Sequence, residues 1–459
     1  MDIQELQALF AEHKQVKALG KVLCDDSVKN IFMEGVCASA VPVIFSSIIL
    51  KSSDAVSRPY VFVLNDAEEA GYFYHDLVQI LGDSQVFYFP SSFRRAVKFG
   101  QRDAANEILR TEVVSRLNAG HWPLFVVTSP EAMAEKVVSS GELKVRTLKL
   151  NVGQQAELVD IEKRLFELGF QRVDYVYEPG QFAVRGSILD VFSYSSEYPY
   201  RVDFFGDEID SLRLFEVQSQ LSKEKKDEIV IVPELGTVTS EKVTFTDFLP
   251  VDSVFVLKDM LFLRDVVDQI YHDGFSSQAL IEEQATSEMD AAEQRLKLNA
   301  ESLLVDGATI LKGLLGFRKV WIGSKPDETP QVTLHFNMHP QPIYHKNFEL
   351  INKSFYDYQA DGYKLYILAD SVKQTDRLAA IFEEQGSGIS FIPVNKTLHS
   401  GFLDEDLRVC LFTDHQIFDR FHKYNLRSDK ARSGKIALTL KELQEFNIGD
   451  YVVHVDHGV

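Results

Sequence analysis

Residues 172–216 read RVDYVYEPGQFAVRGSILDVFSYSSEYPYRVDFFGDEIDSLRLFE, and the rest of the chain is organised around this stretch. Apolar residues alternate along it, for example at Phe182, Val184 and Val191, and a turn signal at Pro179-Gly180 precedes them. Alternation with a period of two, interrupted by short turns, is typical of antiparallel strands. We therefore expect a small antiparallel sheet here.

Four arginines interrupt this stretch in a chain that is otherwise acidic. The 459 residues include 48 Lys and Arg against 68 Asp and Glu, so that the formal net charge is −20. The small sheet could therefore display basic and aromatic groups on one face, which indicates a docking surface. The four arginines are Arg172, Arg185, Arg201 and Arg213.

Length and composition limit the class of protein. A chain of 459 residues exceeds what one hydrophobic core usually organises and suggests about three domains. The acidic balance argues against broad coating of nucleic acid, which requires many phosphate-neutralising cations. Cys24, Cys37 and Cys410 are too far apart to predict a disulfide framework or a metal site, so a reducing cytosol is the expected compartment. The longest apolar run, Val41 to Leu50, is too short to span a bilayer.

A strand, a small-residue turn and a helix follow one another near the N-terminus. The expected strand at 30–33 leads into EGVCASAVP, residues 34–42. A phosphate-binding loop at such a position has the pattern G-x-x-x-x-G-K-[S/T], with a lysine for the phosphates and a hydroxyl for magnesium. If Gly35 is the first glycine, the later key positions are lost. The second glycine, the lysine and the hydroxyl residue are replaced by Ala40, Val41 and Pro42. Taken alone, this pattern favours an unrelated turn.

Apolar strands alternate with amphipathic helices on both sides of the 172–216 stretch. This alternation predicts a parallel α/β sheet into which the small antiparallel unit is inserted. A second, smaller α/β unit is expected towards the C-terminal side. Strands of the first sheet are expected at 60–64, 86–90, 124–128, 248–257 and 320–322, and those of the smaller unit at 364–369, 389–392 and 409–413.

Other candidate sites are weaker. The segment with Arg94, Arg95 and Lys98 could contact nucleic acid, although a short loop with a few charges is more often simply solvated. His454 and His457 flank an aspartate, but a strand places residues i and i+3 on opposite faces, which suits a ligand pair poorly. No nucleophile motif is present in the sequence. We therefore predict no catalytic residue and no metal ligand.

Two sets of motifs resemble a known family. Residues 169–174 (GFQRVD), 184–192 (VRGSILDVF) and 200–213 (YRVDFFGDEIDSLR) are similar to a domain that binds UvrA. Residues 449–459 (GDYVVHVDHGV) are similar to the first strand of an RNA-polymerase-interacting domain. Their order resembles the N-terminal part of the bacterial transcription-repair coupling factors (Mfd), whose first domains are related to the excision-repair protein UvrB. The resemblance covers nearly the whole chain.

This resemblance implies an α/β fold with a UvrB-like parallel-sheet domain, an inserted α+β domain that binds UvrA, and a further small α/β domain. The expected bounds are 1–140 and 233–342 for the two parts of the UvrB-like domain, 141–232 for the UvrA-binding domain and 343–440 for the small α/β domain. The last residues, 441–459, would begin the polymerase-interacting domain, so we expect the chain to stop inside it.

The resemblance also changes the interpretation of the loop that begins at Gly35. In the UvrB family the nucleotide site needs an acidic motif as well, and its place here has Lys258 in the position of the metal-coordinating aspartate, followed by Asp259. A cation there repels Mg²⁺. The loss of both motifs implies a degenerate phosphate loop, and therefore no ATP, Mg²⁺ or other cofactor in this chain. UvrB's damage-probing hairpin is also expected to be absent, since only 91–102 precede the next helix.

The implied function is a non-catalytic module that recruits UvrA to stalled RNA polymerase during nucleotide excision repair in the bacterial cytoplasm. RNA polymerase would bind through the region that begins near Gly449, DNA mainly through an ATP-dependent translocase outside this chain, and no membrane is expected. A divergent nucleotide-dependent helicase or DNA-binding fragment remains the alternative. The expected UvrA contacts are Arg172, Phe182, Arg185, Arg201 and Arg213; for each, the alternative is a solvated arginine or a core phenylalanine, because sequence does not fix strand facing.

Overall fold

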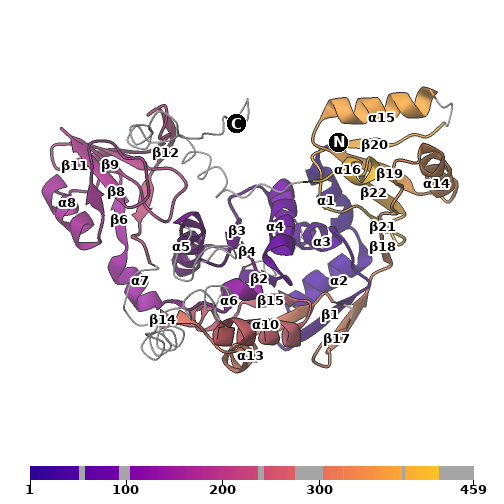
Figure 1. The fold of residues 1–459 in the computed structure, drawn as a ribbon, viewed down its shortest axis with the longest axis horizontal. Helices are drawn as coiled ribbons and strands as arrows, with labels where there is room; N and C mark the ends of the chain where they lie inside the picture. The colour runs from indigo at the N-terminus through magenta and orange to yellow at the C-terminus, as the bar shows by residue number, and fades with distance from the viewer. Residues whose placement is uncertain are drawn as a thin grey trace, which may run out of the picture.

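The computed structural model describes residues 1–50, 57–92, 104–235, 242–273, 303–323, 325–384 and 388–422. A central α/β body carries a small antiparallel unit on one side and a smaller α/β unit on the other (Figure 1). The candidate DNA contacts Arg94, Arg95 and Lys98 and the segment that begins at Gly449 lie outside the described residues.

A seven-stranded parallel sheet forms the centre of the body, in the order β17-β1-β16-β15-β2-β4-β3. Because β15 and β16 lie between β1 and β2, the chain segments before and after the antiparallel unit build one sheet. The prediction of a parallel α/β fold is confirmed. The strands are β1 (Asn30–Glu34), β2 (Pro59–Val63), β3 (Val86–Phe89), β4 (Leu124–Thr128), β15 (Val254–Leu257), β16 (Arg318–Trp321) and β17 (Val332–His335).

Helices cover both faces of this sheet. Along β2, Tyr60 and Phe62 pack on one side and Val61 and Val63 on the other, and all four are buried, as expected for a strand between two helical layers. The first layer contains α1 (Ile3–Ala11), α2 (Lys14–Leu23), α3 (Ala40–Ile49) and α4 (Ala67–Leu81). The second contains α5 (Ala104–Ala119), α6 (Pro130–Met133), α7 (Ser140–Arg146), α9 (Phe245–Phe248), α10 (Met260–Asp273) and α13 (Gly307–Leu314). Among the described residues, no helix has the length and hydrophobicity needed to cross a membrane.

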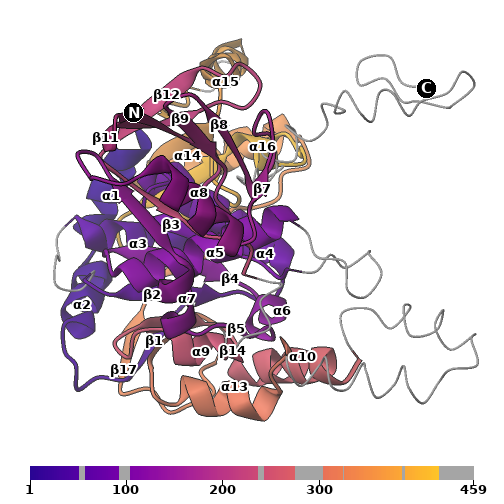
Figure 2. The ribbon, with the colours of Figure 1, turned by 90° about the vertical axis from the view of Figure 1, so that its left-hand side faces the viewer.

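The antiparallel unit is a six-stranded sheet in the order β12-β11-β10-β9-β8-β7. Figure 2 shows the molecule with this unit towards the viewer. Only the pair β7 and β8 is parallel. The antiparallel strands predicted within 172–216 are present as β8 (Gln181–Arg185), β9 (Ile188–Val191), β10 (Tyr200–Phe205) and β11 (Glu208–Phe215). The edge strands β7 (Gln171–Arg172) and β12 (Ser222–Lys226) complete the sheet. Helix α8 (Leu158–Glu167) packs on one face through Ile161 and Leu165. Two short antiparallel pairs flank the unit, β6 (Leu148–Asn151) with β13 (Glu228–Ile231) and β5 (Val137–Val138) with β14 (Lys242–Val243).

The smaller α/β unit has five strands in the order β18-β21-β22-β19-β20. They are β18 (Met338–Pro340), β19 (Lys364–Ala369), β20 (Ile392–Asn395), β21 (Phe402–Asp404) and β22 (Val409–Thr413), with α14 (Phe348–Ala360), α15 (Val372–Glu384) and α16 (Asp414–Ile417). The expected strand at 389–392 therefore begins three residues later. One sheet face packs on α14 and α15, whereas Tyr366, Leu368 and Leu411 on the other face join the cluster that contains Phe10 of α1. The smaller unit and the body thus share a core.

Candidate functional site

The two faces of the six-stranded sheet differ in chemistry. Along β8, Phe182 and Val184 pack towards the α8 core, and the alternation of a strand places Ala183 and Arg185 on the opposite side. Strand register carries this pattern across the sheet. One row on the side away from α8 consists of Ala183, Asp190, Arg201, Arg213 and Lys225. We call this side, which also includes Arg185 and Phe215, the outer face.

Asp190 is the centre of the outer face. Its side chain is 1% exposed, and Arg201 donates to it twice, from Nε to Oδ1 at 2.7 Å and from Nη2 to Oδ2 at 2.9 Å. Arg185 also donates to Oδ2. Arg201 is 15% exposed and lies 4.3 Å from the centre of the Phe215 ring, whereas Arg185 is 35% exposed. Arg201 is therefore mainly structural, and Arg185 is both oriented and accessible.

The outer face continues on both sides of Asp190. The guanidinium of Arg185 lies 4.7 Å from the ring centre of Tyr175, which is exposed. Arg213 donates to Asp203, and Lys225 next to it is exposed. Arg and aromatic side chains are enriched in protein interfaces because they combine charge with large contact area. Chemically, the outer face can dock an acidic surface of another protein.

Two of the predicted contact residues are not on the outer face. Phe182 is completely buried among Leu165 and Val191, so the prediction that it contacts a partner is wrong. Arg172 pairs with Phe182 in the sheet register and forms an ion pair with Glu162 of α8, with 3.1 Å between Nη1 and Oε1, which places it on the α8 side although it is 51% exposed. The structure therefore brings together Arg185, Arg201 and Arg213, and separates Arg172 from them.

Sequence reasoning missed three residues of the outer face. Asp190 is the shared anion of two arginines, Tyr175 stacks on Arg185, and Lys225 extends the basic row. Alternation along the strands gave a usable signal for Asp190, which lies between the apolar residues Leu189 and Val191 and must face the opposite side from them. Tyr175 and Lys225 depend on register and loop geometry that the sequence does not reveal.

The loop that begins at Gly35 is closely packed. Gly35 has φ +82°, and a Cβ there would lie 2.0 Å from the carbonyl oxygen of Phe336. The residues in the positions of the glycine, lysine and hydroxyl, namely Ala40, Val41 and Pro42, are all buried. At the start of α3, where a phosphate would accept backbone N–H groups, Ser39 N–H donates to the Ser400 carbonyl at 3.3 Å. In return, Ser400 N–H donates to Ser39 Oγ at 2.9 Å. The smaller α/β unit thus occupies this position.

The residues at the predicted acidic motif have structural partners. Lys258 forms an ion pair with Glu69 of α4. Asp259 accepts a hydrogen bond from Phe262 N–H at 2.7 Å, in the first turn of α10. Lys258 therefore links α4 to the end of β15, and Asp259 caps the first turn of α10.

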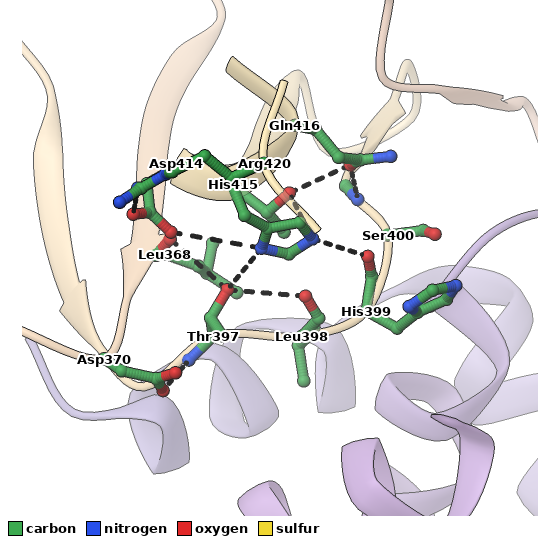
Figure 3. Close-up of polar contacts among 12 residues, drawn as sticks. Leu368, Asp370, Thr397, Leu398, His399, Ser400, Asp414, His415, Gln416 and Arg420 are labelled. Carbon is green, nitrogen blue, oxygen red and sulfur yellow. Dashed lines mark hydrogen bonds and ion pairs between the residues drawn. The ribbon is translucent and has the colours of Figure 1, made fainter. Parts of the chain in front are cut away.

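Residues 396–401 form a loop of the smaller α/β unit that packs against the body. Within the unit, Thr397 N–H donates to Asp370 Oδ1 at 3.1 Å and His415 Nε2 donates to the His399 carbonyl at 2.9 Å (Figure 3). Towards the body, His399 N–H donates to Asp76 Oδ1 at 2.7 Å, and the His399 ring stacks on Tyr72 with 3.6 Å between ring centres. The loop is therefore held from both sides.

Four histidines gather at this junction, with His422 near His75, His399 and His415. Burial lowers the pKa of His75, His399 and His415 to about 4, and it also lowers the pKa of His422. Burial raises the pKa of Asp76 to about 7. At neutral pH the four rings are accordingly uncharged.

Acidification from about pH 7 to about pH 5 is expected to destabilise this junction. Over this window the unfolded chain, whose histidines have ordinary pKa values, binds more protons than the folded chain, so stability is lost as pH falls. Asp76 and Asp414, whose pKa values are raised by burial, act in the opposite direction, but the four histidines outnumber them. The melting temperature, measured at several pH values between about 7 and 5, checks this predicted loss of stability. His399→Phe keeps a ring on Tyr72 and should make the melting temperature depend less on pH. An unchanged dependence of the melting temperature on pH would contradict the role assigned to the buried histidines.

Comparison with known proteins finds similarity for the antiparallel unit and for the whole chain. Residues 148–235 match the family described as UvrB interaction domain, and this range contains the whole outer face. The chain is 23% identical over 476 residues to a transcription-repair-coupling factor of Staphylococcus aureus, covering 88% of the chain and 40% of the relative. It is 21% identical over 523 residues to that of Bacillus subtilis, covering 100% and 44%. The resemblance to the N-terminal region of transcription-repair-coupling factors is confirmed. The chain spans about two-fifths of the length of these coupling factors.

Proposed function

We propose that the chain is a non-catalytic, UvrB-like module of a transcription-repair-coupling factor that recruits UvrA through the outer face of the antiparallel unit. The observation that carries this proposal is the match of residues 148–235 to the UvrB interaction domain, together with the accessible, oriented guanidinium of Arg185 within that range. UvrA is the partner that the resemblance of the 172–216 stretch implies.

The chemistry of the outer face supports binding of an acidic protein surface. Asp190 fixes the guanidinium of Arg185 in one orientation, which reduces the conformational entropy lost on binding. Arg213 and Lys225 add positive charge farther along the same row of residues. Desolvated Arg and Tyr side chains in such surroundings commonly dominate interface energies.

The packing of the degenerate loop supports the non-catalytic part of the proposal. The position of a phosphate at α3 is taken by the backbone of Ser400, and Val41 has no ammonium to replace the missing lysine. We therefore propose that this chain needs neither a nucleotide nor Mg²⁺. A helicase-like fragment remains the alternative, and saturable ATP binding in the presence of Mg²⁺ would favour it.

Other partners belong to the longer protein that the coupling-factor relatives represent. We propose that contacts with RNA polymerase begin near Gly449, that ATP-driven movement on DNA belongs to a translocase outside these residues, and that the module works in the bacterial cytoplasm. The acidic net charge of −20 agrees with a module that binds proteins more than DNA.

The test uses Arg185→Ala and, as a matched control, Arg172→Ala. Each variant removes one arginine that pairs with a carboxylate, but the two arginines lie on opposite faces of the same sheet. Arg185→Ala is expected to weaken the affinity for UvrA at least about tenfold, as is usual for a central interface arginine. Arg172→Ala should change the affinity for UvrA less than about twofold. Both variants should fold; in Arg185→Ala, Arg201 still neutralises Asp190.

A further inference from the structure

Three metal-ligating side chains converge where the N-terminal helices meet the smaller α/β unit. His13 lies between α1 and α2 and is 1% exposed, Asp404 ends β21 and is 0% exposed, and Asp406 in the following turn is 39% exposed. One ligand atom of each, His13 Nε2, Asp404 Oδ2 and Asp406 Oδ2, lies within 4.8 Å of the other two. Nearly four hundred residues of sequence separate the histidine from the aspartates.

Two of these atoms lack a hydrogen-bond partner although they are buried. His13 Nε2 and Asp404 Oδ2 both belong to this group. Leaving a polar group buried and unpaired costs about 1–3 kcal/mol, so such atoms need an explanation. Nε2 lies 3.4 Å from Asp404 Oδ2 and 3.5 Å from Asp406 Oδ2, which is longer than a charge-assisted hydrogen bond of about 2.8 Å.

The same separations suit ligands that share one ion. Nitrogen and oxygen ligands lie about 2.1 Å from Zn²⁺, and at the tetrahedral angle two such ligands stand about 3.4 Å apart. A tetrahedral site with three protein ligands has a fourth position for water. Asp406 is the most exposed of the three side chains.

Each ligand is oriented by a further contact. Asp404 Oδ1 accepts a hydrogen bond from Leu407 N–H at 2.8 Å, and Asp406 Oδ1 accepts one from Asn337 Nδ2 at 3.0 Å. The His13 ring is stacked between Phe10 and Phe336. Such contacts hold ligands in place, and the apolar walls strengthen electrostatic attraction to a cation.

The ring proton of His13 must move when a metal binds. Nδ1 accepts a hydrogen bond from Gln15 N–H at 3.0 Å, so without metal the proton of the neutral ring is on Nε2 and points at the two carboxylates. Coordination at Nε2 transfers that proton to Nδ1 and breaks the hydrogen bond from Gln15. Metal binding therefore changes the environment of the Gln15 amide.

We propose that His13, Asp404 and Asp406 form a binding site for a borderline first-row divalent cation, Zn²⁺ foremost, which ties the N-terminal helices to the smaller α/β unit. The imidazole ligand favours Zn²⁺ over Mg²⁺ and Ca²⁺, which prefer all-oxygen sites. Binding to the folded state alone raises its stability in proportion to the logarithm of the ion concentration.

The test is calorimetric titration of the whole chain, freed of metal by a chelator, with Zn²⁺ and separately with Mg²⁺. One Zn²⁺ per chain is expected, with a rise in Tm and a shifted Gln15 amide resonance. Asp406→Asn replaces an exposed coordinating carboxylate by a neutral amide, a much poorer Zn²⁺ ligand, and should weaken Zn²⁺ binding at least about tenfold.

The matched control is Glu405→Gln, which neutralises the adjacent exposed carboxylate that contacts His339. It should leave the affinity for Zn²⁺ unchanged. Equal affinities of the wild type and Asp406→Asn, an effect of Glu405→Gln as large as that of Asp406→Asn, or no stoichiometric Zn²⁺ binding would each overturn the proposal. In those cases the buried Asp404 carboxylate and the His13 imidazole merely share the Nε2 proton.

Discussion

Replacing Asp190 by Ala is expected to lower the free energy of unfolding of the antiparallel unit by about 3–5 kcal/mol, because it removes one partner of a buried ion pair. Asp190 is 1% exposed and accepts hydrogen bonds from both Arg201 and Arg185. Without the carboxylate, the guanidinium of Arg201 stays over the Phe215 ring with an uncompensated charge. Denaturant unfolding of the variant and of the wild type measures the loss.

Asp203→Ala is the matched control on the same face. Asp203 also pairs with an arginine, Arg213, but it is 20% exposed and solvent screens the pair. Partly exposed ion pairs contribute about 1 kcal/mol or less, so the loss should be much smaller than for Asp190→Ala. Similar losses for the two variants would contradict the structural role assigned to Asp190.

Gly35→Ala is expected to destabilise the body by at least about 3 kcal/mol, because strain of a positive φ and a steric clash add together. Gly35 has φ +82°, and the new Cβ would lie 2.0 Å from the Phe336 carbonyl oxygen, a backbone atom that cannot rotate away. The loss should appear as a lower denaturation midpoint.

Gly120→Ala separates the two contributions. Gly120 has φ +72°, but nothing lies within 4 Å of a Cβ built there. Only the backbone conformation is then unfavourable, by about 1–2 kcal/mol. If Gly35→Ala were no worse than Gly120→Ala, the close approach of the Gly35 backbone to Phe336 would not be a stabilising feature of the fold.

Hydrophobic periodicity predicted the elements of this fold well. The expected strands at 364–369 and 409–413 coincide with β19 and β22. These segments are strongly apolar or strongly amphipathic, so local pattern alone determines their type. The insertion of the antiparallel unit into a parallel sheet also followed from the change of pattern along the chain. The exact domain bounds stay predictions.

The candidate site was predicted less completely. Phe182 and Arg185 are three residues apart and therefore lie on opposite faces of β8, and a sequence does not say which face meets α8. The sequence pattern groups Arg172 with the other arginines, but in the structure Arg172 is in register with Phe182. The contact between Ser39 and Ser400 joins residues far apart in sequence, and no local pattern predicts such a contact.

Affinity for UvrA of the wild type, Arg185→Ala and Arg172→Ala, measured side by side with a thermal melt of each, tests the central claim most directly. The outer face is the docking surface if Arg185→Ala binds UvrA at least about tenfold more weakly while Arg172→Ala binds nearly as well as the wild type. If instead Arg172→Ala is the weakened variant, or if all three bind equally with equal melting temperatures, the outer face does not bind UvrA.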